Sequence, residues 1–245
     1  MTSPVELAKL CLDVGLCTSR LDESLALYRD RLGLPYEELL KISKGNRQHR
    51  LGLRGSVLKI NESRDDLALA PSGFRRILIA DATIAAPDVH VDPEGVTVER
   101  VLPGTAGVTA LGVVMAVADV GAQVRFLTDG LWGDALGPTS TSADPPDPQR
   151  VRIGTTVLLL EHDPSAERTG RREALGFRYM TIQVHDVAAT HRHLLALGFE
   201  EGLAPVRLGE TAAISFIRDP GGNWWEISQR ANLTGPLPDL PRGTV

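Results

Sequence analysis

The sequence predicts a mixed α+β fold built from a duplicated unit, and matching segments in the two halves of the chain support this prediction. Residues 13–33 read DVGLCTSRLDESLALYRDRLG and residues 112–132 read GVVMAVADVGAQVRFLTDGLW, and each suggests an apolar strand, a short turn and a helix. GFRRILIAD at 73–81 matches GFRYMTIQVHD at 176–186. Because these pairs occur in the same order, they indicate duplication of a larger unit.

A third pair of segments is DPEGVTVERVLP at 92–103 and DPGGNWWEISQR at 219–230. Each has Asp-Pro, a Gly at the fourth position and a Glu seven residues after the Asp. Such a phrase before an apolar run is typical of a tight turn that leads into a strand. We therefore expect Glu99 and Glu226 to point into a cavity from the last strand of their units.

The two halves differ in length at one place. After residues 176–186 the chain continues as an amphipathic helix that contains Leu194 and ends at Gly198, a common helix stop. After residues 73–81 only ATIAAPDV precedes the next turn, so we expect the first half to lack this helix.

A domain boundary is predicted near Pro103-Gly104. It divides the chain into an N-terminal domain, residues 1–104, a C-terminal domain, residues 105–232, and a loose tail, residues 233–245.

The composition is that of a globular protein with no basic character. The chain has 245 residues, 42% of them hydrophobic, with 26 Lys and Arg against 31 Asp and Glu. The net charge of −5 argues against nucleic acid as the main partner. MTSPVELAKL has neither a signal-peptide pattern nor a membrane span, so no membrane partner and a cytoplasmic location are expected. Cys11 and Cys17 lie too far apart along an extended strand to pair with each other.

Alternation along the strands predicts a ligand pocket. Tyr179, Thr181 and Gln183 share one strand face, and the Met-Ile-Val face opposite is expected to meet the helices. Trp224 lies on the same side of its strand as Glu226. We expect these five side chains to border an open concavity with a few polar groups.

Small residues on another strand would leave room opposite these side chains. Gly112 and Val114 share a face, and Leu159 is expected to complete an apolar wall. The substrate-binding residues are therefore predicted to be Trp224, Thr181, Gln183, Val114, Leu159 and Gly112. The alternative is that these are ordinary core and surface faces.

SLALYRDRLGL at 24–34, taken with DPGGNWWE at 219–226, resembles the vicinal oxygen chelate superfamily of glyoxalases, bleomycin-resistance proteins and extradiol dioxygenases. The resemblance covers roughly residues 7 to 230. It implies βαβββ modules that pair into half-open barrels of mixed sheet. Four modules would give two such barrels, with the second module shortened, as in the two-domain extradiol dioxygenases. Family members often pair, so a homodimer is compatible with the resemblance.

The resemblance also implies where a metal site would lie, with a His on the first strand and a Glu on the last strand of each of two modules. In the first half these positions fall on Asp13, Lys59, Arg76 and Glu99. Two fixed cations would repel a metal ion, so an ion-paired plug is expected and this domain is interpreted as degenerate. In the second half the positions fall on Gly112, Leu159, Tyr179 and Glu226.

Only Glu226 in the second half is a good metal ligand, so no metal and no other cofactor are predicted. A register shift that brought Glu161 or His162 to the site would restore a metal there. The other histidines are interpreted as ordinary structural or surface residues: His49, His90, His185, His191 and His193.

Three functions remain open at this point. The first is a metal-free enzyme, a lyase or isomerase, that acts on a small, partly aromatic molecule. Glu226 would be its acid/base among apolar neighbours, and Tyr179 would donate a hydrogen bond to a developing oxyanion. The second is a binding protein that sequesters a planar aromatic compound of the antibiotic type without chemistry. The third is a metal-dependent extradiol dioxygenase or glyoxalase, which the missing histidines disfavour.

Overall fold

Four successive modules make up the chain in the computed structural model, which describes residues 6–42, 46–63, 65–138 and 148–243. The first module contains β1 (Asp13–Thr18), α1 (Leu21–Leu25), which continues into the π-helical segment η1 (Ala26–Arg31), β2 (Tyr36–Lys41), β3 (Asn46–Leu53) and β4 (Ser56–Ser63). The second contains β5 (Phe74–Ala80), β6 (Asp88–Val91) and β7 (Thr97–Val101).

The third module follows a short 3-10 turn, η2 (Thr105–Gly107). It contains β8 (Leu111–Val117), α2 (Val120–Arg125), which continues into the π-helical segment η3 (Phe126–Gly130), β9 (Asp134–Gly137), β10 (Gln149–Ile153) and β11 (Thr156–His162). The fourth contains β12 (Gly176–Gln183), α3 (Val187–Ala196), β13 (Glu200–Leu208), β14 (Ala212–Arg218) and β15 (Trp224–Arg230), and the short α4 (Ala231–Thr234) follows it.

The second module is shortened, as the sequence predicted. Residues 81–87, all of them described, join β5 directly to β6 without a helix. In the fourth module α3 occupies this place, and Gly198 follows it with a φ of 86°, a conformation that suits glycine.

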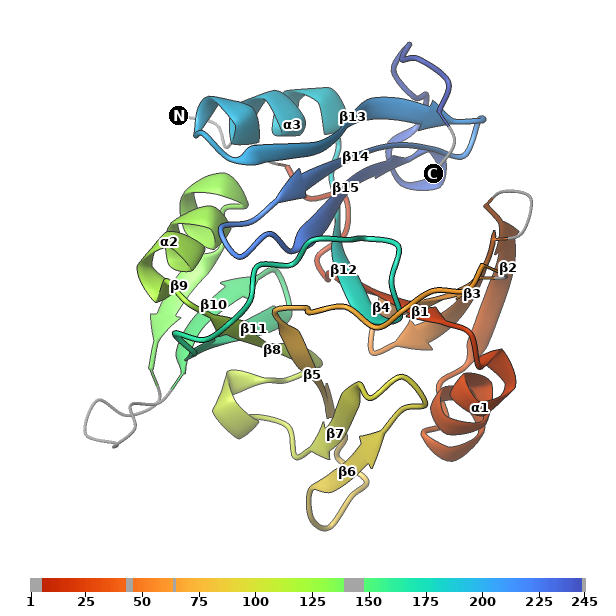
Figure 1. Ribbon diagram of the computed structural model, residues 1–245, viewed down its shortest axis with the longest axis vertical. Coiled ribbons are helices and arrows are strands. Elements are labelled where there is room, and N and C mark those ends of the chain that lie inside the picture. The colour runs from red at the N-terminus through yellow and green to blue at the C-terminus, as the bar shows by residue number, and fades with distance from the viewer. Residues whose placement is uncertain (1–5, 43–45, 64, 139–147, 244–245) are drawn as a thin grey trace.

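The strands form two mixed sheets, neither closed into a barrel, and each sheet combines modules from both halves of the chain. The eight-stranded sheet has the order β13-β14-β15-β12-β1-β4-β3-β2, and the seven-stranded sheet has the order β6-β7-β5-β8-β11-β10-β9. β1 pairs antiparallel with β12, and β5 pairs antiparallel with β8. Figure 1 shows the teal β12 between the red β1 and the blue β15, with the yellow and green strands in the other sheet.

This pairing differs from the expected arrangement, in which residues 1–104 and residues 105–232 each enclose a cavity of their own. The first module shares a sheet with the fourth, and the second shares a sheet with the third. The physical reason is that the first strand of a module can pair with the first strand of any other module. The order of motifs along the chain does not distinguish between these partners.

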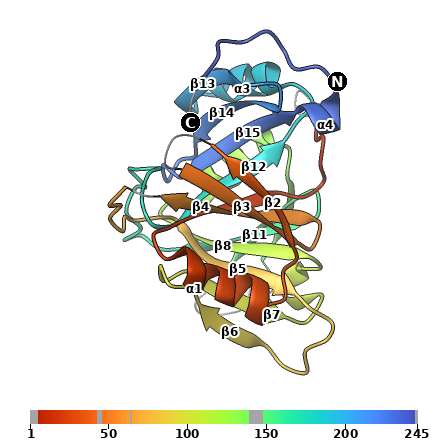
Figure 2. The same cartoon turned by 90° about the vertical axis from the view of Figure 1, so that its right-hand side faces the viewer.

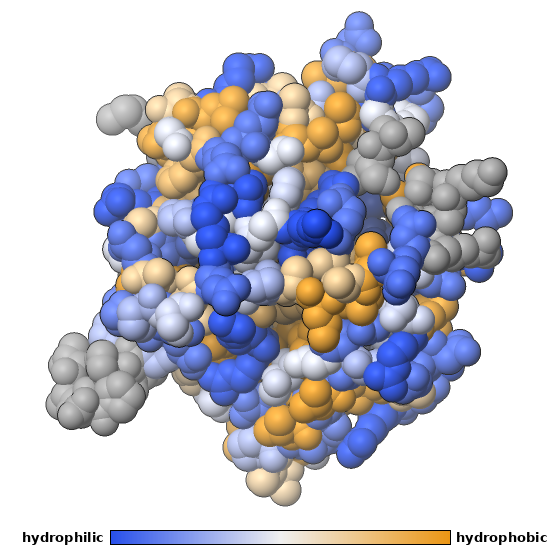
Figure 3. Space-filling model, in the orientation of Figure 1, coloured by the Kyte–Doolittle hydropathy of each residue, from blue (hydrophilic) through white to orange (hydrophobic). Residues whose placement is uncertain are grey.

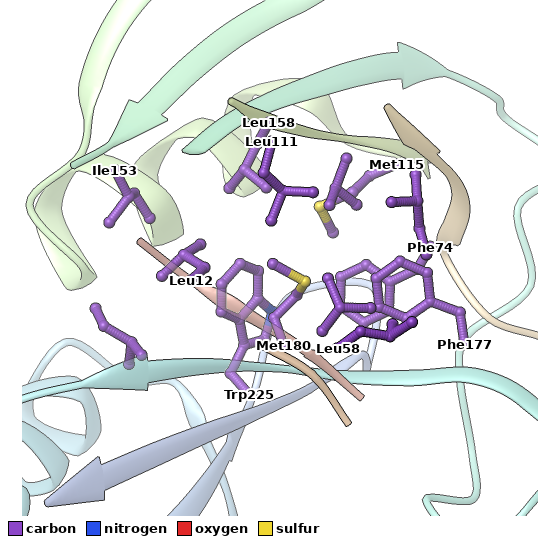
Figure 4. Close-up of a cluster of buried hydrophobic side chains, with 14 of the residues drawn as sticks. Leu12, Leu58, Phe74, Leu111, Met115, Ile153, Leu158, Phe177, Met180 and Trp225 are labelled. Atoms are coloured by element: carbon purple, nitrogen blue, oxygen red, sulfur yellow. The ribbon is translucent and has the colours of Figure 1, made fainter. Parts of the chain in front are cut away.

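The main hydrophobic core lies between the two sheets (Figure 4). Met180 and Trp225 of the eight-stranded sheet approach Met115 of the other sheet, and all three are fully buried. Phe74 and Phe177 stack with their ring centres 4.6 Å apart. The face of β12 that carries Met180 was expected to meet the helices, but Met180 packs against the other sheet. The opposite faces of the sheets are therefore free to border cavities.

The two Asp-Pro turns connect consecutive modules. Tyr28 of η1 donates its hydroxyl proton to Asp92 Oδ2 at 3.0 Å, and Gln123 of α2 donates to Asp219 Oδ2, also at 3.0 Å. The glycines at the fourth position have φ values of 85° and 75°, which a tight turn requires. Figures 1 and 2 place α1 close to the β6–β7 turn. These helix-to-turn hydrogen bonds thus join module one to module two and module three to module four. The sheets instead join module one to module four and module two to module three.

The outer surface is mixed in character. Figure 3 shows several separate apolar areas on one face, divided by hydrophilic side chains. Among the described residues, none of the helices has the length and apolar character needed to cross a bilayer.

Candidate functional site

The concave face of the eight-stranded sheet brings together four residues that the sequence had assigned to two different sites. Asp13 lies on β1, Lys59 on β4, Tyr179 on β12 and Glu226 on β15. The strand pairing places Thr181 directly between Asp13 and Glu226. The first and last strands of modules one and four therefore form one site.

Lys59 is the centre of this site. Its ammonium lies 2.9 Å from Glu226 Oε2 and 2.7 Å from Thr181 Oγ1, and the residue is only 3% exposed. The Thr181 hydroxyl in turn donates to Glu226 Oε2 at 3.1 Å. Burial lowers the pKa of Lys59, and the carboxylates of Glu226 and Asp13 oppose this effect. Glu226 thus has an ammonium as its neighbour instead of the apolar side chains that were expected.

Asp13 forms a second charged pair beside the first. Its Oδ1 accepts hydrogen bonds from Lys9 Nζ at 2.6 Å and from the Val57 backbone N–H at 2.9 Å. Its Oδ2 accepts from Gln183 Nε2 at 3.1 Å. Burial alone would raise the pKa of Asp13, but Lys59, Lys9 and these hydrogen bonds hold it below its ordinary value.

These residues do not fit a divalent metal ion. The positions that the resemblance assigns to metal ligands hold two carboxylates, a phenol and an ammonium that already contacts one of the carboxylates. The pKa of Tyr179 is raised well above its usual range by burial and by the charge of Glu226, so the phenol keeps its proton. In the part of the chain that the structure describes, no three His, Cys, Asp or Glu side chains are grouped to hold a metal.

Tyr179 lies flat over a residue without a side chain. A Cβ atom added at Gly15 would overlap the Tyr179 ring, so glycine is needed there. The Tyr179 hydroxyl accepts hydrogen bonds from Asn61 Nδ2 at 3.1 Å and Gln48 Nε2 at 3.3 Å. Lys59 Nζ lies 5.5 Å from the ring centre. No described residue accepts the hydroxyl proton, which leaves it available to a ligand.

A cavity of about 450 Å³ opens above this site. Tyr179, Lys59 and Glu226 border it. Its apolar wall is formed by Leu40, Ile42, Leu67, Leu208, Ala212, Ile214 and Phe216. Trp224 does not contribute to the wall formed by described residues, because it lies behind Phe216 with the ring centres 5.9 Å apart. The aromatic surface predicted for Trp224 is therefore supplied by Phe216.

Three predicted pocket residues lie elsewhere. Gly112, Val114 and Leu159 belong to the seven-stranded sheet, because β8 and β11 pair with each other and with β5. Val108 covers this face, and a Cβ atom at Gly112 would lie 2.6 Å from Val108 Cγ2. Val108 packs there in a small apolar cluster that includes Leu78, Ala80, Val101, Val114, Val157 and Leu159. The prediction that these three residues share a pocket with Glu226 is wrong.

Arg76 and Glu99 lie at the rim of this covered face. Arg76 is 2.6 Å from Glu161 and 3.7 Å from Glu99, and its side chain is 40% exposed. The expected ion-paired plug of Asp13, Lys59, Arg76 and Glu99 does not form, because these residues lie in two different sheets. Arg76 pairs with Glu99 here, whereas Asp13 pairs with Lys9 and Lys59 with Glu226 in the other sheet.

A second, larger cavity of about 640 Å³ adjoins the first. Asp13 and Gln183 line it, and Arg50 and Arg230 line both cavities. Sequence reasoning missed the two arginines. Strand alternation could have found Arg230, because it lies four residues after Glu226 and so on the same face of β15.

Comparisons with known proteins agree with this architecture. The model of the Glyoxalase/Bleomycin resistance protein/Dioxygenase superfamily matches residues 109–227. Glyoxalase I from Zea mays superposes with a TM-score of 0.72 at 16% identity, over 89% of this chain and 92% of that chain. A putative dioxygenase from Bacillus subtilis subsp. subtilis str. 168 superposes with a TM-score of 0.68 at 14% identity, over 97% of this chain and 93% of that one. At these identities the likeness shows the fold alone. No curated protein matches in sequence.

Proposed function

We propose, since this chain belongs to the glyoxalase, bleomycin-resistance and dioxygenase superfamily, that it binds a small, partly aromatic organic molecule and moves a proton on it without a metal. The observation that carries the proposal is the pairing of two groups in one cavity. Tyr179 has a hydroxyl proton to donate, and Glu226 has a carboxylate oxygen, Oε1, to which no described residue donates. A cavity of about 450 Å³ is of a size that suits such a ligand.

Glu226 is the proposed base. Its Oε2 accepts hydrogen bonds from Lys59 and Thr181, which hold the carboxylate in place and balance its charge. Oε1 takes a proton from a carbon atom next to a carbonyl group of the ligand, and the electron pair of the C–H bond moves to the carbonyl oxygen. The proton then returns to a different carbon atom, which gives an isomerase, or a leaving group departs, which gives a lyase.

Tyr179 is the proposed donor to the carbonyl oxygen. Burial raises its pKa, so it is a neutral donor across the physiological range. The hydrogen bonds from Asn61 and Gln48 fix the position of its oxygen before any ligand arrives. A fixed donor that faces a developing negative charge lowers the barrier without reorganisation.

Sequestration without chemistry is the second candidate, and one observation favours it. Tyr179 and Phe216 form an edge-to-face pair with ring centres 5.9 Å apart, and both border the cavity. Such a wall binds a planar aromatic ring through stacking and edge contacts. Glu226 and Lys59 already satisfy each other, so binding alone would not require them to react.

The test is solvent-proton exchange. Aryl ketones and aryl keto acids are incubated with the protein in D₂O, and loss of the α-proton signal is followed by NMR. We expect catalysed exchange that Glu226→Gln lowers at least 100-fold. Glu62→Gln is the matched control, because Glu62 also lines the cavity but pairs with Arg47 and His49 at its edge.

Binding of the same compounds is measured by calorimetry. Exchange that persists at the unmodified rate in Glu226→Gln would contradict the role of Glu226. Saturable binding with no exchange by the unmodified protein would favour sequestration.

A further inference from the structure

We propose that the ligand of this cavity carries a single carboxylate, which Arg50 and Arg230 bind where the two cavities meet. The inference rests on the proposed function, because it names the chemical class of the molecule that enters the same site. Arg50 and Arg230 border the cavity, and the proposed proton transfer gives neither of them a direct role.

Both arginines face the same space from different modules. Arg50 lies on β3 of the first module, and Arg230 ends β15 of the fourth. Each lines the 450 Å³ cavity and the 640 Å³ cavity, so both residues lie where these spaces meet. Arg50 is only 7% exposed, which is unusual for an arginine that forms no hydrogen bond to a carboxylate.

Arg230 differs from the cations beside it in its contacts. Lys9 lies 2.6 Å from Asp13, Lys59 lies 2.9 Å from Glu226, and Arg50 lies 3.6 Å from Glu38. For the Arg230 side chain, no described residue accepts a hydrogen bond or forms an ion pair within 4.0 Å. Its neighbour Arg50 contacts Glu38 only at long range. An incoming anion with one charge would give Arg230 the partner that it lacks.

The two guanidinium groups also repel each other in the free protein. Burial lowers the pKa of Arg230 and the nearby charge of Arg50 lowers it further, while the carboxylates of Glu38, Glu226 and Asp13 act in the opposite direction. A carboxylate between them would remove this repulsion and accept charge-assisted hydrogen bonds from both groups. Arg50 is held ready for this contact because its Nη1 donates to Gln48 Oε1 at 3.1 Å.

The remaining wall indicates what the rest of the molecule is like. Phe216, Ile214 and Ala212 line the 450 Å³ cavity with apolar surface, and Tyr179 and Glu226 border it too. A ligand with its carboxylate at the arginines would place an aryl or alkyl body against Phe216. One charge and an apolar body describe an aromatic or hydrophobic carboxylic acid better than a phosphate ester, which brings up to two charges.

The experiment uses a matched pair of probes, 2-naphthoate and 2-naphthamide, which differ in charge but hardly in shape. Their dissociation constants are measured by calorimetry with the unmodified protein, with Arg230→Gln and Arg50→Gln, and with Arg47→Gln. Arg47 is the control, because it lies on β3 as Arg50 does but does not line either cavity. Thermal unfolding of each variant checks that it is folded.

We expect the acid to bind at least about tenfold more tightly than the amide, and Arg230→Gln to remove that preference. Arg50→Gln is expected to weaken the acid similarly, and Arg47→Gln to leave both constants unchanged. Equal binding of acid and amide, unaffected by Arg230→Gln, would overturn the carboxylate subsite and leave the proposed function standing. Failure of both probes to bind up to their solubility limits would overturn the subsite and also count against the proposed function.

Discussion

The two sheets are built alike, yet their concave faces differ. Each sheet joins two modules through antiparallel first strands. The face of the eight-stranded sheet holds Lys59, Glu226 and Asp13 beneath open cavities. The face of the seven-stranded sheet is filled by Val108 and its apolar neighbours. Paired modules therefore provide two equivalent sheet faces on which a site could form. The side chains on each face determine whether it borders an open cavity or is filled.

The difference also shows how buried charges at the base of a cavity are compensated. Lys59 and Glu226 satisfy each other, so neither charge is left uncompensated when it is removed from water. On the face of the seven-stranded sheet, Arg76 is partly exposed, so water also solvates its charge. The following variants test this contrast, from the largest expected effect to the smallest.

Lys59→Met should be the most damaging change, because it leaves Glu226 and Asp13 as buried carboxylates without their common cation. Loss of one partner of a buried pair costs about 3–5 kcal/mol of unfolding free energy. Arg76→Met on the other face should cost less than about 1 kcal/mol, since exposed pairs contribute little. Urea unfolding of the two variants measures both values. Equal losses would contradict the contrast between the two faces.

The pH dependence of unfolding provides an internal check on Lys59→Met. The pKa of Asp13 is held below its ordinary value in the folded protein. Its contribution to stability is therefore present above the unfolded-state pKa, about 3.9, and is lost as the pH falls through the lowered value. Without Lys59 this loss should begin at a higher pH.

Asp219→Asn should destabilise the protein more than Asp92→Asn does. Asp219 Oδ2 accepts from the indole N–H of Trp225 at 3.1 Å, and this group can only donate. An amide NH₂ in place of Oδ2 would face that donor, at a cost of about 2–3 kcal/mol. Asp92 Oδ2 meets the hydroxyl of Tyr28, which can rotate and accept, so about 1 kcal/mol is expected. Thermal unfolding compares the two, and a reversed order would contradict this account of the turns.

Gly112→Ala tests the packing of the filled face. Its new methyl group would meet Val108 Cγ2 at 2.6 Å, which should cost about 1–2 kcal/mol of unfolding free energy. Val108→Ala, which leaves a small cavity, should cost about 1 kcal/mol by itself. The double variant Val108→Ala/Gly112→Ala should be more stable than the sum of the two single changes predicts. Strict additivity in urea unfolding would show that Val108 does not fill this face.

The sequence was informative about modules and uninformative about their pairing. The Asp-Pro turns, the missing helix of the second module and the two faces of β12 all follow from local patterns, because turns and alternation depend on neighbouring residues. The partner of β1 depends on contacts between residues far apart in the chain. Gly112 and Leu159 were therefore wrongly placed in a cavity with Glu226, although the strands that carry them were recognised.

The candidate site was predicted only in part for the same reason. Tyr179 and Glu226 do face one cavity, but the ammonium that contacts Glu226 comes from Lys59, which the sequence had placed in the other half. Trp224 has the predicted orientation along its strand, yet Phe216 of the adjacent strand covers it. No periodicity within one segment reports on a side chain that another strand supplies.

The nesting of the sheets fixes the order in which they can be completed during synthesis. The seven-stranded sheet uses only the continuous stretch from β5 to β11, so all its strands are synthesised before the fourth module. The eight-stranded sheet must join β1 to β12, and more than half the chain separates them. Until β12 emerges, β1 has an unpaired edge, which is a template for wrong partners. The cavity that carries the candidate site is thus the last part of the protein to acquire its walls.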